Sequence, residues 1–169
     1  MIYVKKLKSY IISGIIFVSV LGTLFHFTYN WSGNNVFIGL FTPINESVWE
    51  HTKLLFLPML IYSFYLNKKI GKDYPCLNSA MISGMLSGVA LIIVMFYTYT
   101  GILGFHTDFA DISIFYISVF LAFWIGYKLT ISCKAEKYSK LLWLLQIIII
   151  CLYIIFTFFP PNIPLFVSS

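Results

Sequence analysis

Five stretches of the chain are each apolar over about 20 residues or more, which is close to the roughly 20 residues a helix needs to cross the hydrocarbon core of a bilayer. These stretches are residues 9–30, 43–66, 77–101, 109–132 and 140–159. With 60% hydrophobic and 10% charged residues, a soluble domain of 169 residues could not bury this much apolar surface. We therefore predict an all-α integral membrane protein, a single domain over residues 1–169 built as a bundle of five transmembrane helices.

The positive charges predict the orientation of these helices. All are lysines, and all except Lys53 fall within residues 5–8, 68–72 or 128–140. Lysine-rich loops tend to stay on the cytoplasmic side, so we predict a cytoplasmic N-terminus and an outside C-terminus in a bacterial cytoplasmic (cell) membrane. The net charge of +5 is then a topology signal. The expected partner is the lipid bilayer, and no nucleic acid is expected.

Two further patterns concern packing and cysteine chemistry. Gly84 and Gly88 are four residues apart, which gives the third predicted helix a surface of small residues. We expect this surface to contact other helices of the chain, and the alternative is a membrane-protein partner at the Gly84/Gly88 face. Cys76, Cys133 and Cys151 are isolated and lack a C-x-x-C spacing, which predicts neither a disulfide framework nor a zinc motif.

Polar residues gather near the predicted outer ends of the helices, where all three histidines and four of the six acids lie. A helical spacing of 100° per residue puts four residues of the second span on one face and His51 on another. These four are Glu46, Trp49, Glu50 and Lys53. Ionisable groups inside a membrane are functional candidates by default. The catalytic candidates are Glu50, His26 and Lys53, and the surrounding polar cluster is Asn30, Asn34, Asn45, Glu46 and Trp49.

One hypothesis joins several of these residues in a divalent-metal site. Its ligands are His26, Glu50 (or Glu46), His106 and Asp111, which supply two imidazoles and two carboxylates. That ligand mixture suits zinc or a related divalent ion, which can activate a water molecule for hydrolysis. A variant of this hypothesis without metal uses Glu50 as general base and His26 or His106 as its acid partner.

A structural role explains the same residues. Thr42 followed by Pro43 is a good N-cap and first-turn pair for the second helix, so Glu46 can complement the helix dipole. Glu50 and Lys53 are three residues apart and can form a buried ion pair that orders the bundle.

The residues around the second span also carry a resemblance. The segments involved are residues 30–35, the Asn-Glu-Ser-x-Trp-Glu-His-x-Lys motif of residues 45–53, and residues 160–166. Together they resemble an uncharacterised family of small bacterial polytopic membrane proteins, classed as a domain of unknown function. The resemblance runs over most of the chain. It implies location in a membrane and brings no assigned activity with it.

These observations lead to three functional hypotheses. The first is a membrane-embedded, metal-assisted hydrolase that acts on a lipid or peptide near the outer leaflet. The second is a small transporter or accessory binding subunit whose Glu50–Lys53 pair binds a polar ligand or relays a proton. The third is a purely structural or immunity-type membrane protein. Convergence of His26, Glu50 and His106 around a wet cavity favours the enzyme, and a polar path beyond Lys53 favours transport.

Overall fold

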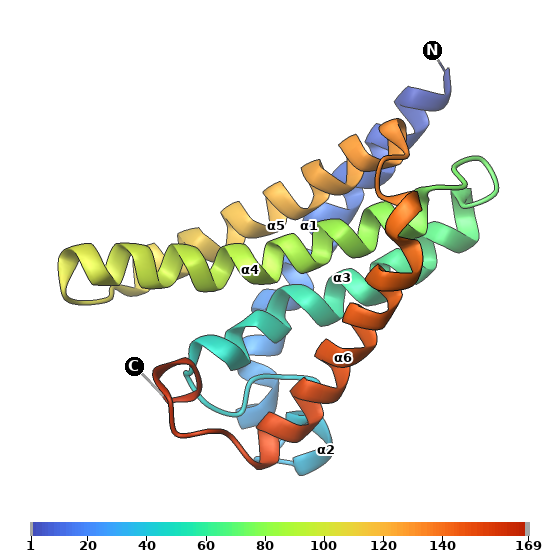
Figure 1. Ribbon diagram of the computed structural model, residues 1–169. Helices are drawn as coiled ribbons and strands as arrows, with labels where there is room; N and C mark the ends of the chain where they lie inside the picture. The colour runs from blue at the N-terminus through green and yellow to red at the C-terminus, as the bar shows by residue number, and fades with distance from the viewer. Residues whose placement is uncertain (1, 168–169) are drawn as a thin grey trace.

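In the computed structural model, the described residues 2–167 fold into helices joined by short loops, with no strand among them (Figure 1). The elements are α1 (Ile2–Trp31), α2 (Val36–Gly39), α3 (Val48–Ile70), α4 (Leu77–Leu103), α5 (Asp108–Ser132), the short 3-10 helix η1 (Glu136–Tyr138), α6 (Ser139–Phe158) and the 3-10 helix η2 (Pro164–Phe166). The predicted all-α class is confirmed.

Four of the five long helices are long and apolar enough to cross a membrane. They are α1, from residue 5 on, α4, α5 and the segment Glu136–Phe158 that contains α6. The chain is thus a helical membrane protein, as its apolar runs predict. The fifth long helix, α3, carries Glu50, Lys53 and two lysines in its last turn. A five-span count and the orientation of the termini therefore stay predictions.

The helix α3 is the core of the molecule. Thirteen of its 23 residues are buried, whereas only three of the 20 residues of α6 are. It contacts α1, α4, α5 and α6, which together enclose it. A helix with charged side chains can occupy this position because its neighbours shield those charges from lipid.

The start of α3 differs from the predicted one. The helix begins at Val48, and the hydroxyl of its N-cap residue Ser47 accepts a hydrogen bond from the backbone N–H of Glu50 at 3.4 Å. The hydroxyl of Thr42 instead donates to the carbonyl of Ile38, at the end of α2. The prediction that the helix starts at Thr42 and Pro43 was therefore wrong. Glu46 lies outside the helix and does not share a helical face with Glu50.

The small residues of α4 pack within the chain. A Cβ atom added to Gly84 would lie 2.3 Å from the carbonyl oxygen of Ala122 in α5, and one added to Gly88 would lie 2.9 Å from the Ala122 side chain. Only glycine allows the two backbones to approach this closely. The Gly84/Gly88 face, also considered for a membrane-protein partner, is thus covered by α5.

A disulfide closes the α4–α5 hairpin, which corrects the prediction from the cysteine spacing. Cys76, just before α4, is bonded to Cys133, just after α5, with the Cα atoms 5.3 Å apart. The two residues are 57 positions apart in the chain, and only the antiparallel packing of the helices brings them together. Lys6 also pairs with Asp73 at 2.8 Å, so the N-terminal lysines and the loop before α4 meet at this end.

Candidate functional site

The candidate site is a pocket of about 590 Å³ at the end of the helices remote from the disulfide. Residues of α1, α3, α4, α5 and the loops before α3 and α5 line it. The α4–α5 hairpin diverges from α1 and α3 toward its connecting loop (Figure 1). The histidine and acidic residues that line the pocket are His26, Glu46, His51, His106, Asp108 and Asp111. All three histidines of the chain therefore face one cavity.

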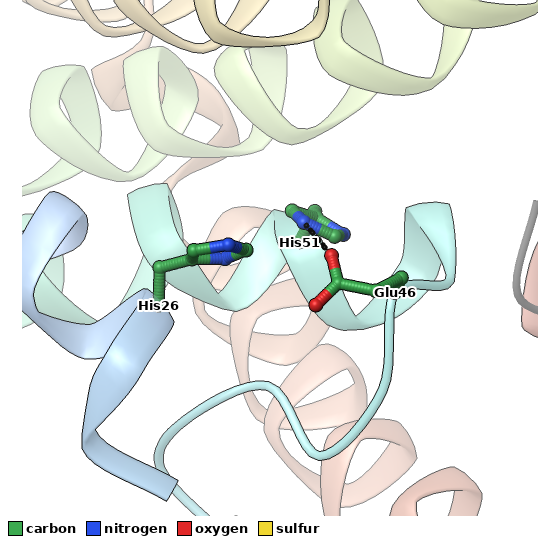
Figure 2. A group of neighbouring side chains, drawn as sticks. All are labelled: His26, Glu46 and His51. Atoms are coloured by element: carbon green, nitrogen blue, oxygen red, sulfur yellow. Dashed lines mark ion pairs between the residues drawn. The ribbon is translucent and has the colours of Figure 1, made fainter. Parts of the chain in front are cut away.

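Three of these side chains form what we call the His51 cluster: His26, Glu46 and His51. Figure 2 shows the ring of His26, from α1, directed toward the ring of His51 and the carboxylate of Glu46. One ligand atom from each residue lies within 4.8 Å of those of the other two. The Nε2 atom of His51 is 3.2 Å from a carboxylate oxygen of Glu46, and the two imidazole rings are 5.3 Å apart between centroids.

The backbone fixes which nitrogen of His51 is available. Its Nδ1 atom lies 2.9 Å from the carbonyl oxygen of Ser47, which can only accept, so Nδ1 carries a proton. In a neutral ring the Nε2 lone pair then faces the Glu46 carboxylate. Two lone pairs at 3.2 Å repel each other unless a positive charge lies between them, and that charge is a proton or a metal ion. The hydrogen bond from His51 lowers the pKa of Glu46 below its usual value, so Glu46 is ionised at neutral pH.

The His51 cluster has the composition of a catalytic zinc site. Two imidazoles and one carboxylate are a known three-ligand set, with the fourth position open to water. Ligands at about 2.0–2.1 Å from a tetrahedral ion lie about 3.3 Å from each other, close to the separation already present between His51 and Glu46. The hydrogen bond from Nδ1 of His51 to Ser47 is the outer-shell contact that orients a metal-binding imidazole.

A second histidine–acid pair lines the same pocket. The Nδ1 atom of His106 lies 3.3 Å from one carboxylate oxygen of Asp111, whose other oxygen accepts a short hydrogen bond from the hydroxyl of Tyr99. The Tyr99 hydroxyl accepts in turn from the backbone N–H of Thr107 at 3.3 Å. The acid is held from both sides and orients the imidazole, as required of a group that transfers protons.

Glu50 and Lys53 lie in a different place, which we call the Lys53 cluster: Lys53, Glu50, Thr157 and the carbonyl of Gly39. The ammonium group donates to Glu50 at 2.7 Å, to the Thr157 hydroxyl at 2.6 Å and to the Gly39 carbonyl at 3.2 Å. All three protons of the lysine are thereby used. The side chain of Lys53 is 0% exposed and that of Glu50 is 3% exposed. The buried ion pair expected from the structural alternative is present.

The structure therefore brings together only part of the predicted metal set. His26, His106 and Asp111 line the pocket, whereas Glu50 lies in the Lys53 cluster and Glu46 takes the position expected of Glu50. Sequence reasoning placed His51 away from the site. The missed signal is the Ser-x-x-Glu pattern from Ser47 to Glu50, which marks a helix start.

The remaining predicted polar residues shape the loops and the core. The carbonyl of Asn30 accepts from Gly33, Asn34 has a left-handed backbone with φ of 61°, and the side chain of Asn45 accepts from the backbone N–H of Ser47. The last of them, Trp49, is buried among Tyr153, Phe156 and Phe166. None of the four lines the pocket.

Comparison with known proteins identifies a family but no function. No curated protein and no solved structure matches the chain. One family does match, over residues 1–169, and its description is a family of unknown function, DUF6512. The expected resemblance to an uncharacterised family is confirmed, and the chain belongs to DUF6512.

Proposed function

We propose that the protein is a membrane-embedded hydrolase that holds a divalent metal ion, zinc or a related ion, with His26, Glu46 and His51. The observation that carries this proposal is the His51 cluster itself, in which three ligand atoms lie within 4.8 Å at the wall of a pocket. A cluster of this kind that was closed off from any substrate would hold a metal ion for stability alone. Here it shares its cavity with the His106–Asp111 pair.

The chemistry follows from the His51 cluster and the His106–Asp111 pair. A divalent ion in a three-ligand site lowers the pKa of water in the fourth position to about 7. His106, oriented by Asp111, takes one proton from the attacking water. The water oxygen adds to the electrophilic carbon of an ester or amide. The bond from that carbon to the leaving oxygen or nitrogen breaks, and His106 returns its proton to the leaving group.

The membrane orientation is part of the same proposal. With five spans and lysine-rich loops inside, the pocket opens near the outer leaflet of a bacterial cytoplasmic membrane, on the side away from Lys6, Cys76 and Cys133. The Lys53 cluster then lies at the same end, beneath α2. Its saturated hydrogen bonds and lack of exposure support a structural role, because a proton relay or ligand site needs an accessible group.

One comparison of two acids tests the proposal. The protein is purified and loaded with zinc, and bound metal is measured for wild type, Glu46→Gln and Glu50→Gln. We expect about one zinc ion per chain in the wild type, loss of that ion in Glu46→Gln and its retention in folded Glu50→Gln. A wild-type protein without bound zinc would mean that a proton bridges His51 and Glu46, and the metal proposal would be abandoned.

A further inference from the structure

We propose that the substrate is a single-chain acyl ester or amide whose headgroup is uncharged or cationic, bound with its chain between α1 and α5. This inference rests on the proposed hydrolase function, and it adds the class of substrate. It depends on three properties of the pocket: the order of polar and apolar residues along it, its position at the surface of the bundle, and its charge.

All the charged and imidazole groups of the lining lie toward the loop ends of the helices, and the part further in is mostly apolar. On α3, Leu54 lies one turn further from the loop end than His51, and both line the pocket. On α5, Ile114 and Phe115 lie one turn further in than Asp111. Near the mouth the ligating and proton-transferring groups lie among apolar side chains such as Val48, and further in the lining is apolar except for the Thr23 and Tyr116 hydroxyls, which bond to each other. A molecule that fills such a cavity has a polar head and an apolar chain.

The pocket also reaches the surface of the bundle at α1 and α5, two of the helices that line it. These helices are joined by a hydrogen bond of 3.1 Å between the hydroxyls of Thr23 and Tyr116. Toward the loop ends, the lining residues Phe27 of α1 and Ile112 of α5 are 44% and 58% exposed. Such large exposed apolar residues at a membrane helix surface face acyl chains, so a chain can pass between them from the bilayer into the pocket.

Size and charge limit the ligand further. A volume of about 590 Å³ falls within the range of roughly 300–1,000 Å³ that encloses a drug-sized ligand, which fits one chain better than the two chains of a phospholipid. Among the described lining residues, three are carboxylates (Glu46, Asp108 and Asp111) and none is a lysine. One divalent ion does not fully offset three carboxylates, so an anionic headgroup is disfavoured.

The experiment separates binding from hydrolysis. A photoreactive monoacylglycerol is incorporated into phosphatidylcholine nanodiscs that contain the protein, because detergents are themselves single-chain amphiphiles and would compete. Labelling of the protein is measured after illumination, with and without zinc. Unlabelled monooleoylglycerol, oleoylcholine and the anionic oleoyl-lysophosphatidylglycerol serve as competitors. Release of fatty acid or free alcohol is measured in the same samples.

Three tryptophan variants on α5 locate the binding site. Ile114→Trp fills the buried part of the pocket, and Ile112→Trp blocks its side without disturbing the core, because Ile112 is exposed. Ile117→Trp is the matched control, since Ile117 is 44% exposed and lies outside the pocket lining. We expect labelling to fall about tenfold in the first two variants and to stay at the wild-type level in the control.

The outcomes are distinct. Normal labelling of folded Ile112→Trp and Ile114→Trp would overturn the inference, and competition by the anionic lipid equal to that by the uncharged one would overturn its headgroup part. His51→Ala is expected to keep the labelling and to lose hydrolysis. Labelling that follows this pattern without any hydrolysis by the zinc-loaded wild type would instead remove the proposed function and leave the binding site in place.

Discussion

The His51 cluster and the Lys53 cluster differ in burial and in how far their hydrogen bonds are satisfied, although Glu46, Glu50, His51 and Lys53 all come from the same short segment around the start of α3. In the Lys53 cluster every ammonium proton has an acceptor and both charged side chains are almost fully buried. In the His51 cluster the side chains of His51 and Glu46 are 31% and 64% exposed and line a cavity. Saturated, buried charges stabilise a fold, whereas accessible ligand atoms are free to bind.

The largest expected effect is on stability and comes from the Lys53 cluster. Lys53→Met leaves the Glu50 carboxylate buried without its partner, and losing one member of a buried pair costs about 3–5 kcal/mol. Thermal unfolding in lipid should therefore occur at a much lower temperature. The double variant Glu50→Gln with Lys53→Met removes both charges and should recover much of the loss. Wild-type stability in Lys53→Met would show that this cluster is not the structural one.

The next effect is on metal affinity and comes from the His51 cluster. In the proposed site His51→Ala removes a direct ligand, so zinc affinity should fall by more than the roughly 10–100-fold that is typical of lost outer-shell partners. Unfolding of the metal-free protein should hardly change. His106→Ala is the control, because His106 lines the pocket without belonging to the cluster. Equal zinc affinity of the two variants would contradict the assignment of ligands.

A comparable loss is expected in catalysis when proton transfer is removed. His106→Ala should lower the hydrolysis rate about 100-fold with zinc still bound, since general acid–base groups typically contribute 100-fold or more. Asp111→Asn should lower it less, because Asp111 orients His106. The measurement is the rate of zinc-loaded protein with an acyl ester in nanodiscs. An unchanged rate in His106→Ala would leave proton transfer to another group.

A smaller effect concerns pH in the metal-free protein. The hydrogen bond from His51 lowers the pKa of Glu46, so the pair contributes stability that is present above the ordinary glutamate pKa of 4.5. That contribution is lost as pH falls through the lower pKa of the folded state. Wild type should therefore be slightly more stable than Glu46→Gln at about pH 6, and the difference should shrink and then disappear as the pH falls below the ordinary glutamate pKa and through the lower pKa of the folded state. A difference that persists at low pH would contradict the ionised pair.

The last prediction concerns the redox state of Cys76 and Cys133 and involves no change in activity. It tests which side of the membrane both clusters face. Cys76 and Cys133 lie at the lysine-rich end, and thiols in the cytosol are kept reduced. With that end cytoplasmic, alkylation during cell lysis should trap both cysteines as thiols, and the bond should form only on later oxidation. A bond already present at lysis would place the lysine-rich end outside and the pocket inside.

Much of the architecture could be predicted from local sequence properties. The apolar runs predicted the long helices to within a few residues, except at the start of α1, which begins at Ile2 and not near residue 9, and at the start of α3, where Ser47 rather than Thr42 is the N-cap. That shift of a few residues changed which side chains form the candidate site. It moved Glu46 off the helix, where it meets His51, and left Glu50 to pair with Lys53. Angles on an ideal helix predict neighbours only when the first residue of the helix is known.

The sequence by itself determined the membrane class, the helical architecture and the gathering of polar residues near one end of the helices, because apolar run length and charge distribution are local properties of the chain. Only the tertiary structure decided which side chains meet. Thr157 reaches Glu50 across 107 positions, Cys76 reaches Cys133 across 57, and His26 of α1 faces His51 of α3. Such contacts depend on how helices cross and where they diverge, and that geometry is set by packing between segments distant in the chain.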